Sequence, residues 1–394
     1  MKIYLDNAAT APMPIEVFEA MKPYFLEQYG NPSAIYSFAE ETREAVEAAR
    51  KTLAGVINAK TREIYFTAGG TESDNWALKM VAEGYADKGK HIITTKIEHH
   101  AVLHTCEYLE KQGFEVTYLE VDECGRVHPE TLEKAIRPDT ILISVMTANN
   151  EIGTIQPIRE IGEIAHKHGI LFHTDAVQAF GHIPLDVEQM NIDLLSASGH
   201  KIGGPKGIGL LYIRNGVRVR PFIHGGAQER AKRAGTLNVP GIVGFARAAE
   251  LALEGMEEKI RYEEGLRDYL IERVLKEIPY SRVNGDRERR LPGNVHFCFR
   301  YIEGESMLIL LDHKGICASS GSACTSGSLD PSHVLLAIGL PHEMAHGSLR
   351  LTLSERNTRE EMDYVVAELK DIVEKLRSMS PLYEDFLKEE AAHV

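Results

Sequence analysis

The sequence lacks any uninterrupted apolar run that approaches the roughly 20 residues of a membrane-spanning helix. Its N-terminus, residues 1–6, has no apolar segment of the kind found in secretory signal peptides, so we expect no signal peptide. The five cysteines are an odd number without CxxC spacing, which favours free thiols over disulfides or a zinc site. We therefore expect a cytoplasmic protein with no metal site and no membrane association.

The sequence also has fewer basic than acidic residues. Lysine and arginine total 44 residues against 58 aspartates and glutamates, which leaves a formal net charge of −14. Because nucleic-acid binding depends on clustered basic residues, this balance argues against a nucleic-acid partner. A composition of 43% hydrophobic and 26% charged residues is typical of a globular protein. A chain of 394 residues exceeds one compact core, so we expect two domains.

Short apolar runs alternate with helical patterns between about residues 60 and 215. The expected strands cover residues 64–67, 91–95, 115–121, 140–146 and 207–213, and two more end at Asp175 and just before Lys201. The expected helices between them cover residues 70–85, 98–111 and 158–168. This alternation predicts βαβ units with a mostly parallel sheet, which is the α/β class. Ligands of such sheets bind beyond the carboxyl ends of the strands.

Other helical patterns lie on either side of this region. Helices are expected over residues 15–28, 42–57, 240–278 and 305–311, with one or more breaks in the third, and a further strand over 294–299. A last helix follows the capping signal at 357–361 and carries one apolar stripe from Met362 to Leu376. The stretch from residue 240 marks the passage into a second domain, and we expect the charged tail 384–394 to be mobile.

Lys201 stands at the end of Ser196-Ala197-Ser198-Gly199-His200-Lys201, between an apolar run and a glycine-rich run. A lysine in such a setting is either a surface loop residue or a Schiff-base lysine. The segment His173-Thr174-Asp175 favours the second interpretation, because it ends a buried strand with a carboxylate. Pyridoxal phosphate needs both groups, a lysine for its aldehyde and an anion for its pyridinium nitrogen.

Three other motifs fall at expected strand ends. Gly69-Gly70-Thr71 precedes a helix whose free N–H groups can hold a phosphate, although many βα turns carry similar residues. His99 is either a ring-stacking proton carrier or a helix cap, and Asn150 either contacts a cofactor oxygen or shapes a turn. None of these motifs alone separates the two interpretations.

The stretch 318–328 contains only small and polar residues around Cys324, so we expect a mobile loop. A thiol that must move between two sites needs such a tether, which favours a nucleophilic role for Cys324. For Cys106, Cys298 and Cys317 we expect burial and no chemistry.

Taken together, these motifs resemble those of NifS/IscS-type cysteine desulfurases, fold-type-I pyridoxal-phosphate enzymes of the class-V aminotransferase family. The similarity runs from residues 4–10 to residues 349–354, nearly the whole chain, and is most specific at residues 173–178, 198–201 and 319–327. It implies an aspartate-aminotransferase-like α/β fold and a homodimer that converts L-cysteine to L-alanine. It also implies a large cofactor domain over residues 16–260 and a small domain formed by residues 1–15 and 261–394.

The resemblance assigns a role to each matching residue. Lys201 would bind the cofactor aldehyde, Asp175 the pyridinium nitrogen, and Cys324 would receive the sulfur. The remaining contacts would be His99 on the ring, Gln178 and Asn150 at the phenol oxygen, and Gly70, Thr71, Ser198 and His200 at the phosphate. Thr236 would reach the phosphate of the partner subunit's cofactor, and Arg350, with Asn150, would hold the substrate. The long form of the Cys324 loop resembles the group that supplies iron–sulfur scaffold proteins.

Two alternatives remain open from the sequence. Another fold-type-I enzyme, such as an aminotransferase or a selenocysteine lyase, would share Lys201 and Asp175, although aminotransfer has no need of a nucleophilic thiol. A protein that keeps the fold only to bind other proteins would need none of these catalytic groups. The intact set of Lys201, Asp175, Cys324 and Arg350 argues against this alternative.

Overall fold

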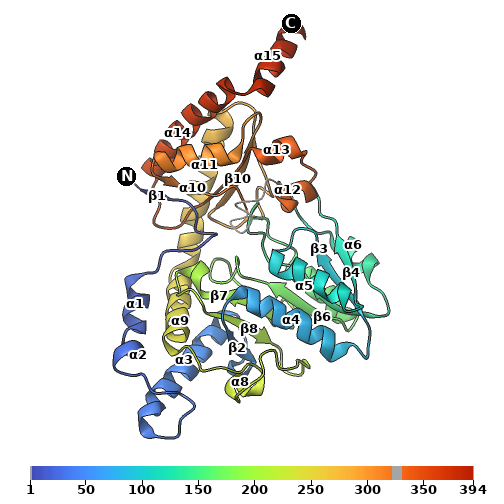
Figure 1. Cartoon of the computed structure of the whole chain (residues 1–394), viewed down its shortest axis with the longest axis vertical. Coiled ribbons are helices and arrows are strands. Elements are labelled where there is room, and N and C mark those ends of the chain that lie inside the picture. The colour runs from blue at the N-terminus through green and yellow to red at the C-terminus, as the bar shows by residue number, and fades with distance from the viewer. Residues whose placement is uncertain (1, 322–330, 394) are drawn as a thin grey trace.

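The computed structural model describes residues 2–321 and 331–393, and its larger part is built on a seven-stranded sheet (Figure 1). The strand order is β2-β8-β7-β6-β5-β3-β4. These strands are β2 (Ile64–Thr67), β3 (His91–Thr95), β4 (Glu115–Leu119), β5 (Thr140–Ser144), β6 (Leu171–Asp175), β7 (Leu194–Ser198) and β8 (Gly209–Ile213). Strand β8 is antiparallel to both its neighbours, and the pairs formed by the strands from β7 to β4 are parallel. The predicted α/β class with a mostly parallel sheet is confirmed.

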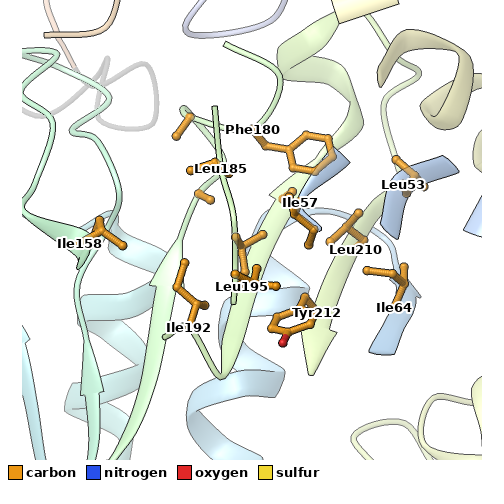
Figure 2. Close-up of a cluster of buried hydrophobic side chains, with 14 of the residues drawn as sticks. Leu53, Ile57, Ile64, Ile158, Phe180, Leu185, Ile192, Leu195, Leu210 and Tyr212 are labelled. Carbon is orange, nitrogen blue, oxygen red and sulfur yellow. The ribbon is translucent and has the colours of Figure 1, made fainter. Parts of the chain in front are cut away.

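Helices bury both faces of this sheet. They are α3 (Glu40–Val56), α4 (Gly70–Tyr85), α5 (His100–Lys111), α6 (Pro129–Ala135), α7 (Ile158–Lys167) and α9 (Val239–Leu253). Successive residues of a strand face opposite sides, so Leu194 belongs to the cluster formed with α4 and α5, whereas Leu195 belongs to the cluster formed with α3, α7 and α9. Figure 2 shows Leu195 in this second cluster, with Leu53 of α3 and Ile158 of α7. Burial on both faces explains why these strands are continuous apolar runs in the sequence.

A second apolar core surrounds an antiparallel sheet with the order β12-β10-β9. Its strands are β9 (Ser281–Val283), β10 (Asn294–Phe299) and β12 (Ser348–Thr352). Helices α10 (Met256–Glu277), α11 (Gly304–His313) and α14 (Arg359–Ser378) pack against it at the top of Figure 1. Short elements complete this part: α12 (His333–Ala337), α13 (His342–His346), and β1 (Ile3–Tyr4), which pairs in parallel with β11 (Ile316–Cys317). The predicted division at residue 260 falls inside α10 and stays a prediction.

The segment after β1 crosses from the smaller sheet to the larger one. The Asn7 side chain donates to the Thr352 carbonyl at 2.7 Å, and the Ala11 N–H donates to the His200 carbonyl at 2.9 Å. These contacts hold the intervening carbonyl groups of residues 8 and 9 against the end of strand β7.

Two predicted elements differ from the structure. The helix expected over residues 15–28 is divided into α1 (Ile15–Met21) and α2 (Pro23–Leu26), because Pro23 has no N–H to continue the helical hydrogen bonds. The tail expected to be mobile forms helix α15 (Pro381–His393), where the Phe386 ring stacks on Tyr301 with centroids 4.9 Å apart. At the start of α14, which α15 follows, the predicted cap is present: Thr358 and Glu361 form a capping box.

The remaining short elements are α8 (Gln228–Ala231) and the 3-10 helices η1 (Ser37–Ala39), η2 (Thr61–Glu63) and η3 (Gly199–Ile202). Over residues 2–321 and 331–393, no helix is long and apolar enough to cross a membrane.

Candidate active site

A cavity of about 250 Å³ lies beyond the carboxyl ends of strands β6 and β7, where the sequence places the ligand. Ten predicted site residues line it: Gly70, Thr71, His99, Asn150, Asp175, Gln178, Ser198, His200, Lys201 and Arg350. They come from strands, loops and helix starts separated by up to 280 positions, which only the fold brings together. Two predicted residues remain: Thr236 is exposed and outside this cavity, and Cys324 lies outside the described residues.

Lys201 follows strand β7 on the short helix η3. Its Nζ donates to the carbonyl of Ala8 at 2.6 Å and to that of Ala9 at 3.0 Å. The Lys201 carbonyl lies 3.1 Å from Nε2 of His182, which fixes the backbone on the other side. The lysine amine is therefore held at the cavity by the N-terminal segment.

Asp175 is the last residue of β6 and is 6% exposed. Burial raises the pKa of its carboxyl to about 6, and the Val177 N–H and the charge of Lys201 oppose that rise. The N–H of Val177 donates to its Oδ1 at 2.9 Å. This is a buried carboxylate whose charge calls for a cationic partner inside the cavity.

Asp74 is a second buried carboxyl at this cavity, and the sequence reasoning missed it. It is 1% exposed, and within the described chain its Oδ1 has no hydrogen-bond partner. Burial, then the negative charge of Asp175, raises the pKa of the Asp74 carboxyl well above its usual range. In the sequence it looks like a solvated helix residue. The available signal was its spacing of three residues from Thr71, which puts both on one helix face.

The start of α4 forms a small cradle at one end of the cavity. A Cβ added at Gly70 would lie 2.5 Å from Cγ2 of Val177, so the close packing here requires glycine. The first N–H groups of a helix have no partner within it and carry the positive end of its dipole. Thr71 and Ser198 add hydroxyl groups to the same end. This arrangement is suited to an anion such as a phosphate.

Two histidines at the cavity are neutral. His99 caps α5, its Nδ1 accepting the Ala101 N–H at 3.1 Å, and burial followed by the charge of Lys201 lowers its pKa to about 4. Burial and Lys201 likewise lower the pKa of His200 to about 4, and its Nδ1 lies 3.3 Å from the Thr10 hydroxyl. Both rings can therefore stack and form hydrogen bonds without carrying charge at pH 7.

Arg350 is 2% exposed and lies on strand β12, across the cavity from Lys201. Its Nη1 donates to the Asn150 carbonyl at 2.9 Å, and its Nη2 donates to Asp6 Oδ1 at 3.0 Å. Its Nε has no hydrogen-bond partner among the described residues. The Gln178 amide donates to the Ala8 carbonyl at 3.0 Å, so it also braces the segment that holds Lys201.

The four described cysteines are free thiols. Cys106 and Cys298 are buried as predicted, and burial raises the pKa of both, to about 11 for Cys298. The prediction for Cys317 is wrong, because this residue is only half-buried at the edge of the small β1–β11 pair.

Comparison with known proteins agrees with this geometry. The pattern of the family described as Aminotransferase class-V matches residues 3–365. The cysteine desulfurase IscS of Methanosarcina thermophila is 61% identical over 380 residues, which cover 96% of this chain and 94% of the relative. A solved NifS-like protein superposes with a TM-score of 0.90 at 42% identity, covering 95% of this chain and all of that one. A solved structure named SspA in complex with cysteine superposes with a TM-score of 0.81 at 39% identity. The match covers 91% of this chain and all of that one.

Fold and site thus define an enzyme of the aspartate-aminotransferase type, with a lysine and a buried aspartate at the carboxyl edge of the sheet. The similarity to relatives over nearly the full length makes the finer distinction. The chain belongs to the class-V aminotransferase family and, within it, to the cysteine desulfurases of the IscS and NifS type.

Proposed function

We propose that this cysteine desulfurase binds pyridoxal phosphate in the 250 Å³ cavity and transfers sulfur from L-cysteine to Cys324. The observation that carries the proposal is the convergence of Lys201, Asp175 and the Gly70-Thr71 helix start on one cavity. A cavity of about 150 Å³ can hold a benzene ring, so this one has room for a substituted pyridine. Lysine, buried carboxylate and helix start match the aldehyde, the ring nitrogen and the phosphate of that cofactor.

When bound, pyridoxal phosphate withdraws electrons from the substrate carbon that carries the amino group. Lys201 would bind the cofactor aldehyde through Nζ, and its amine would carry a proton to and from that carbon. Asp175 would hold the proton on the ring nitrogen. The neutral ring of His99 would stack on the cofactor, and Gln178 and Asn150 would orient its phenol oxygen. Gly70, Thr71, Ser198 and His200 would hold the phosphate.

The sulfur step depends on two further residues. Arg350 lines the cavity, and its guanidinium would bind the substrate carboxylate. The Cys324 thiolate attacks the substrate sulfur, an S–S bond forms and the C–S bond breaks. The electron pair of the broken bond stays with the carbon skeleton, which becomes L-alanine after protonation, and Cys324 is left as a persulfide.

An assay of purified protein tests this function. L-Cysteine alone, with a thiol reductant, is expected to give equal amounts of L-alanine and sulfide. If alanine or any other amino-acid product formed only after addition of a 2-oxo acid, the reaction would be aminotransfer and the proposed function would be wrong.

Asp175→Asn is expected to raise stability and to abolish most of the turnover. The folded pKa of about 6 lies above the 3.8 of an ordinary aspartate, so the folded state holds an extra proton between these values and stability falls as pH rises through them. The neutral amide of the Asp175→Asn variant does not titrate, so the variant does not lose stability over this pH range. Cofactor-free Asp175→Asn should therefore melt a few degrees above wild type at pH 7 and at the same temperature at pH 4.

Turnover of Asp175→Asn should fall about 10²-fold or more, because a preorganised charge is lost. A variant that melts below wild type at pH 7 would contradict this account.

We also propose an obligate homodimer with two shared sites. Apolar side chains are strongly exposed in the N-terminal segment, among them Phe25 at 57%, Leu26 at 73% and Ile35 at 102%. A second, open cavity adjoins the outer side of the Gly70-Thr71 turn, and the exposed Thr236 is available to a neighbour. Unpaired apolar surface of this kind marks a protein interface.

The combined variant Leu26→Asp and Ile35→Asp is expected to shift the protein to a monomer and to lower turnover, because it places charge in the interface. Light scattering and the alanine assay measure the two effects. Leu387→Asp on α15, a side chain that is 45% exposed, is the control and should stay dimeric. A fully active wild-type monomer would refute the shared sites.

For the acceptor we propose an iron–sulfur scaffold protein, on the strength of the long loop that carries Cys324. Transfer of labelled sulfur from Cys324 to such a scaffold, without free sulfide, tests this step. The free thiols of the described cysteines support a cytoplasmic location, because reducing compartments keep cysteines in that state.

A further inference from the structure

Glu151 follows the cavity residue Asn150 and is 1% exposed, and the mechanism above gives it no role. The turn that holds it is rigid. The Oδ1 atom of Asn149 accepts the N–H groups of Glu151 and Ile152 at 2.9 and 3.0 Å. The Asn294 amide, from strand β10, donates to the Glu151 carbonyl at 3.2 Å. The carboxylate is therefore fixed relative to the cavity and to the smaller sheet.

One oxygen of this carboxylate, Oε2, lies close to Gly321 and to Ser332, which stand before and after residues 322–330. The hydroxyl of Ser332 donates to Oε2 of Glu151, and the same Ser332 caps α12 by accepting from Val334 at 3.1 Å. On the other side, a Cβ added at Gly321 would lie 2.8 Å from the same Oε2. Gly321 has a φ of +131°, which disfavours any other residue. Gly321 and Ser332 thus both lie next to the same atom, Oε2 of Glu151.

Further contacts link the two residues before Gly321 to the substrate side of the cavity. The Ser319 carbonyl accepts from the Arg350 N–H at 2.6 Å, and the Ser320 carbonyl accepts from the Ser348 hydroxyl at 2.8 Å. The Arg350 guanidinium in turn donates to the carbonyl of Asn150, next to Glu151. Burial raises the pKa of Glu151, and the Ser332 hydrogen bond, then the charge of Arg350, opposes that rise.

We propose that Glu151 is a positioning residue for sulfur transfer, which sets where the two flanks of residues 322–330 stand relative to Asn150 and Arg350. Glu151 is not among the residues that line the cavity. The proposal rests on the proposed role of Cys324 and deepens it, because a covalent step between two sulfur atoms requires their approach to be aligned. Misplacement by about 1 Å can slow such a step by about 10²-fold.

The test separates sulfur transfer from the steps before it. Wild type, Glu151→Ala, Glu151→Gln, Ser332→Ala and the double variant Glu151→Ala with Ser332→Ala are prepared as holoenzymes. After rapid mixing with L-cysteine, the change in cofactor absorbance reports substrate binding, and quenched samples analysed by mass spectrometry report the rate of persulfide formation. Circular dichroism and cofactor content check that each variant is folded.

Glu151→Ala is expected to slow persulfide formation by about 10²-fold while the absorbance change stays within about twofold of wild type. Glu151→Gln should recover most of the rate, because its amide oxygen still accepts from Ser332. Ser332→Ala should be slow as well, and the double variant no slower than Glu151→Ala, since both changes remove one contact. Glu263→Gln replaces a buried glutamate on α10, an element that carries neither Glu151 nor Ser332, and is the control for loss of a buried carboxylate.

Persulfide formation within about twofold of wild type in both Glu151→Ala and Ser332→Ala would overturn the proposal. An equal loss of the absorbance change and of persulfide formation would also overturn it, since that result indicates a general structural role. If wild type itself forms no persulfide on Cys324, the proposed function fails first and this inference falls with it.

Discussion

Replacing Cys324 by alanine or serine is expected to leave a folded dimer that binds cofactor and responds to cysteine but does not turn it over. The steps before sulfur transfer use Lys201 and Asp175, so the change in cofactor absorbance on adding cysteine should persist. Alanine formation should fall by several orders of magnitude, because a covalent nucleophile has been removed. A residue that only filled space on an exposed loop would change stability by about 0.5 kcal/mol and leave turnover intact. The alanine assay decides between the two.

Cys317 is the matched control for this variant. It is seven positions away and half-buried, and strand β11 holds its backbone beside β1. Cys317→Ser should therefore keep nearly full turnover, and the variant that lacks both thiols should be no slower than Cys324→Ala. If Cys324→Ala turned over cysteine at nearly the wild-type rate, Cys324 would not be the nucleophile, and the proposed sulfur transfer would be wrong.

Lys201→Ala is expected to abolish the covalent link to the cofactor together with turnover. The Lys201 amine is the one placed at the cavity against the carbonyl groups of Ala8 and Ala9, and a methyl group cannot replace it as nucleophile or proton carrier. Asp175 and the Gly70-Thr71 cradle remain, so some cofactor should still bind without a bond to the protein. Turnover should drop by several orders of magnitude.

Borohydride reduction of the loaded protein, followed by peptide mapping, measures the link. Wild type should carry the reduced cofactor on Lys201, and Lys201→Ala should carry none. Lys206→Ala is the control, since this exposed lysine lies five positions away beside the cavity on the outer side of the Gly70-Thr71 turn. Reduced cofactor on any other lysine would refute the assignment.

Strand ends carried most of the information that the sequence offered about the site. Runs such as Leu194-Leu195 are apolar because helices cover both faces of the sheet, and that local pattern marks where β7 ends and Lys201 begins. In a parallel sheet those ends meet at one edge, which is why Asp175 and Lys201 could be placed together from their spacing along the chain.

Contacts between distant segments could not be predicted in this way. The pair Asp6 and Arg350 is separated by 344 positions, and its existence depends on how β12 meets the N-terminal segment. Asp74 was overlooked because a carboxyl on a helix start is ordinarily solvated, and only the packed structure buries it beside Asp175. Helix α15 in the charged tail was not predicted, because the contact between Phe386 and Tyr301 joins segments far apart in the sequence.

The most direct test of the account is to find where the sulfur goes. Holoenzyme is exposed briefly to L-cysteine labelled with a heavy sulfur isotope, digested with trypsin and analysed by tandem mass spectrometry. Cys317 and Cys324 fall in one tryptic peptide, residues 315–350, so fragments that break between them assign the label. The account predicts one labelled sulfur on Cys324 and L-alanine in equal amount. Label on Cys317, Cys124 or another thiol, or alanine formed without any protein-bound label, would contradict it.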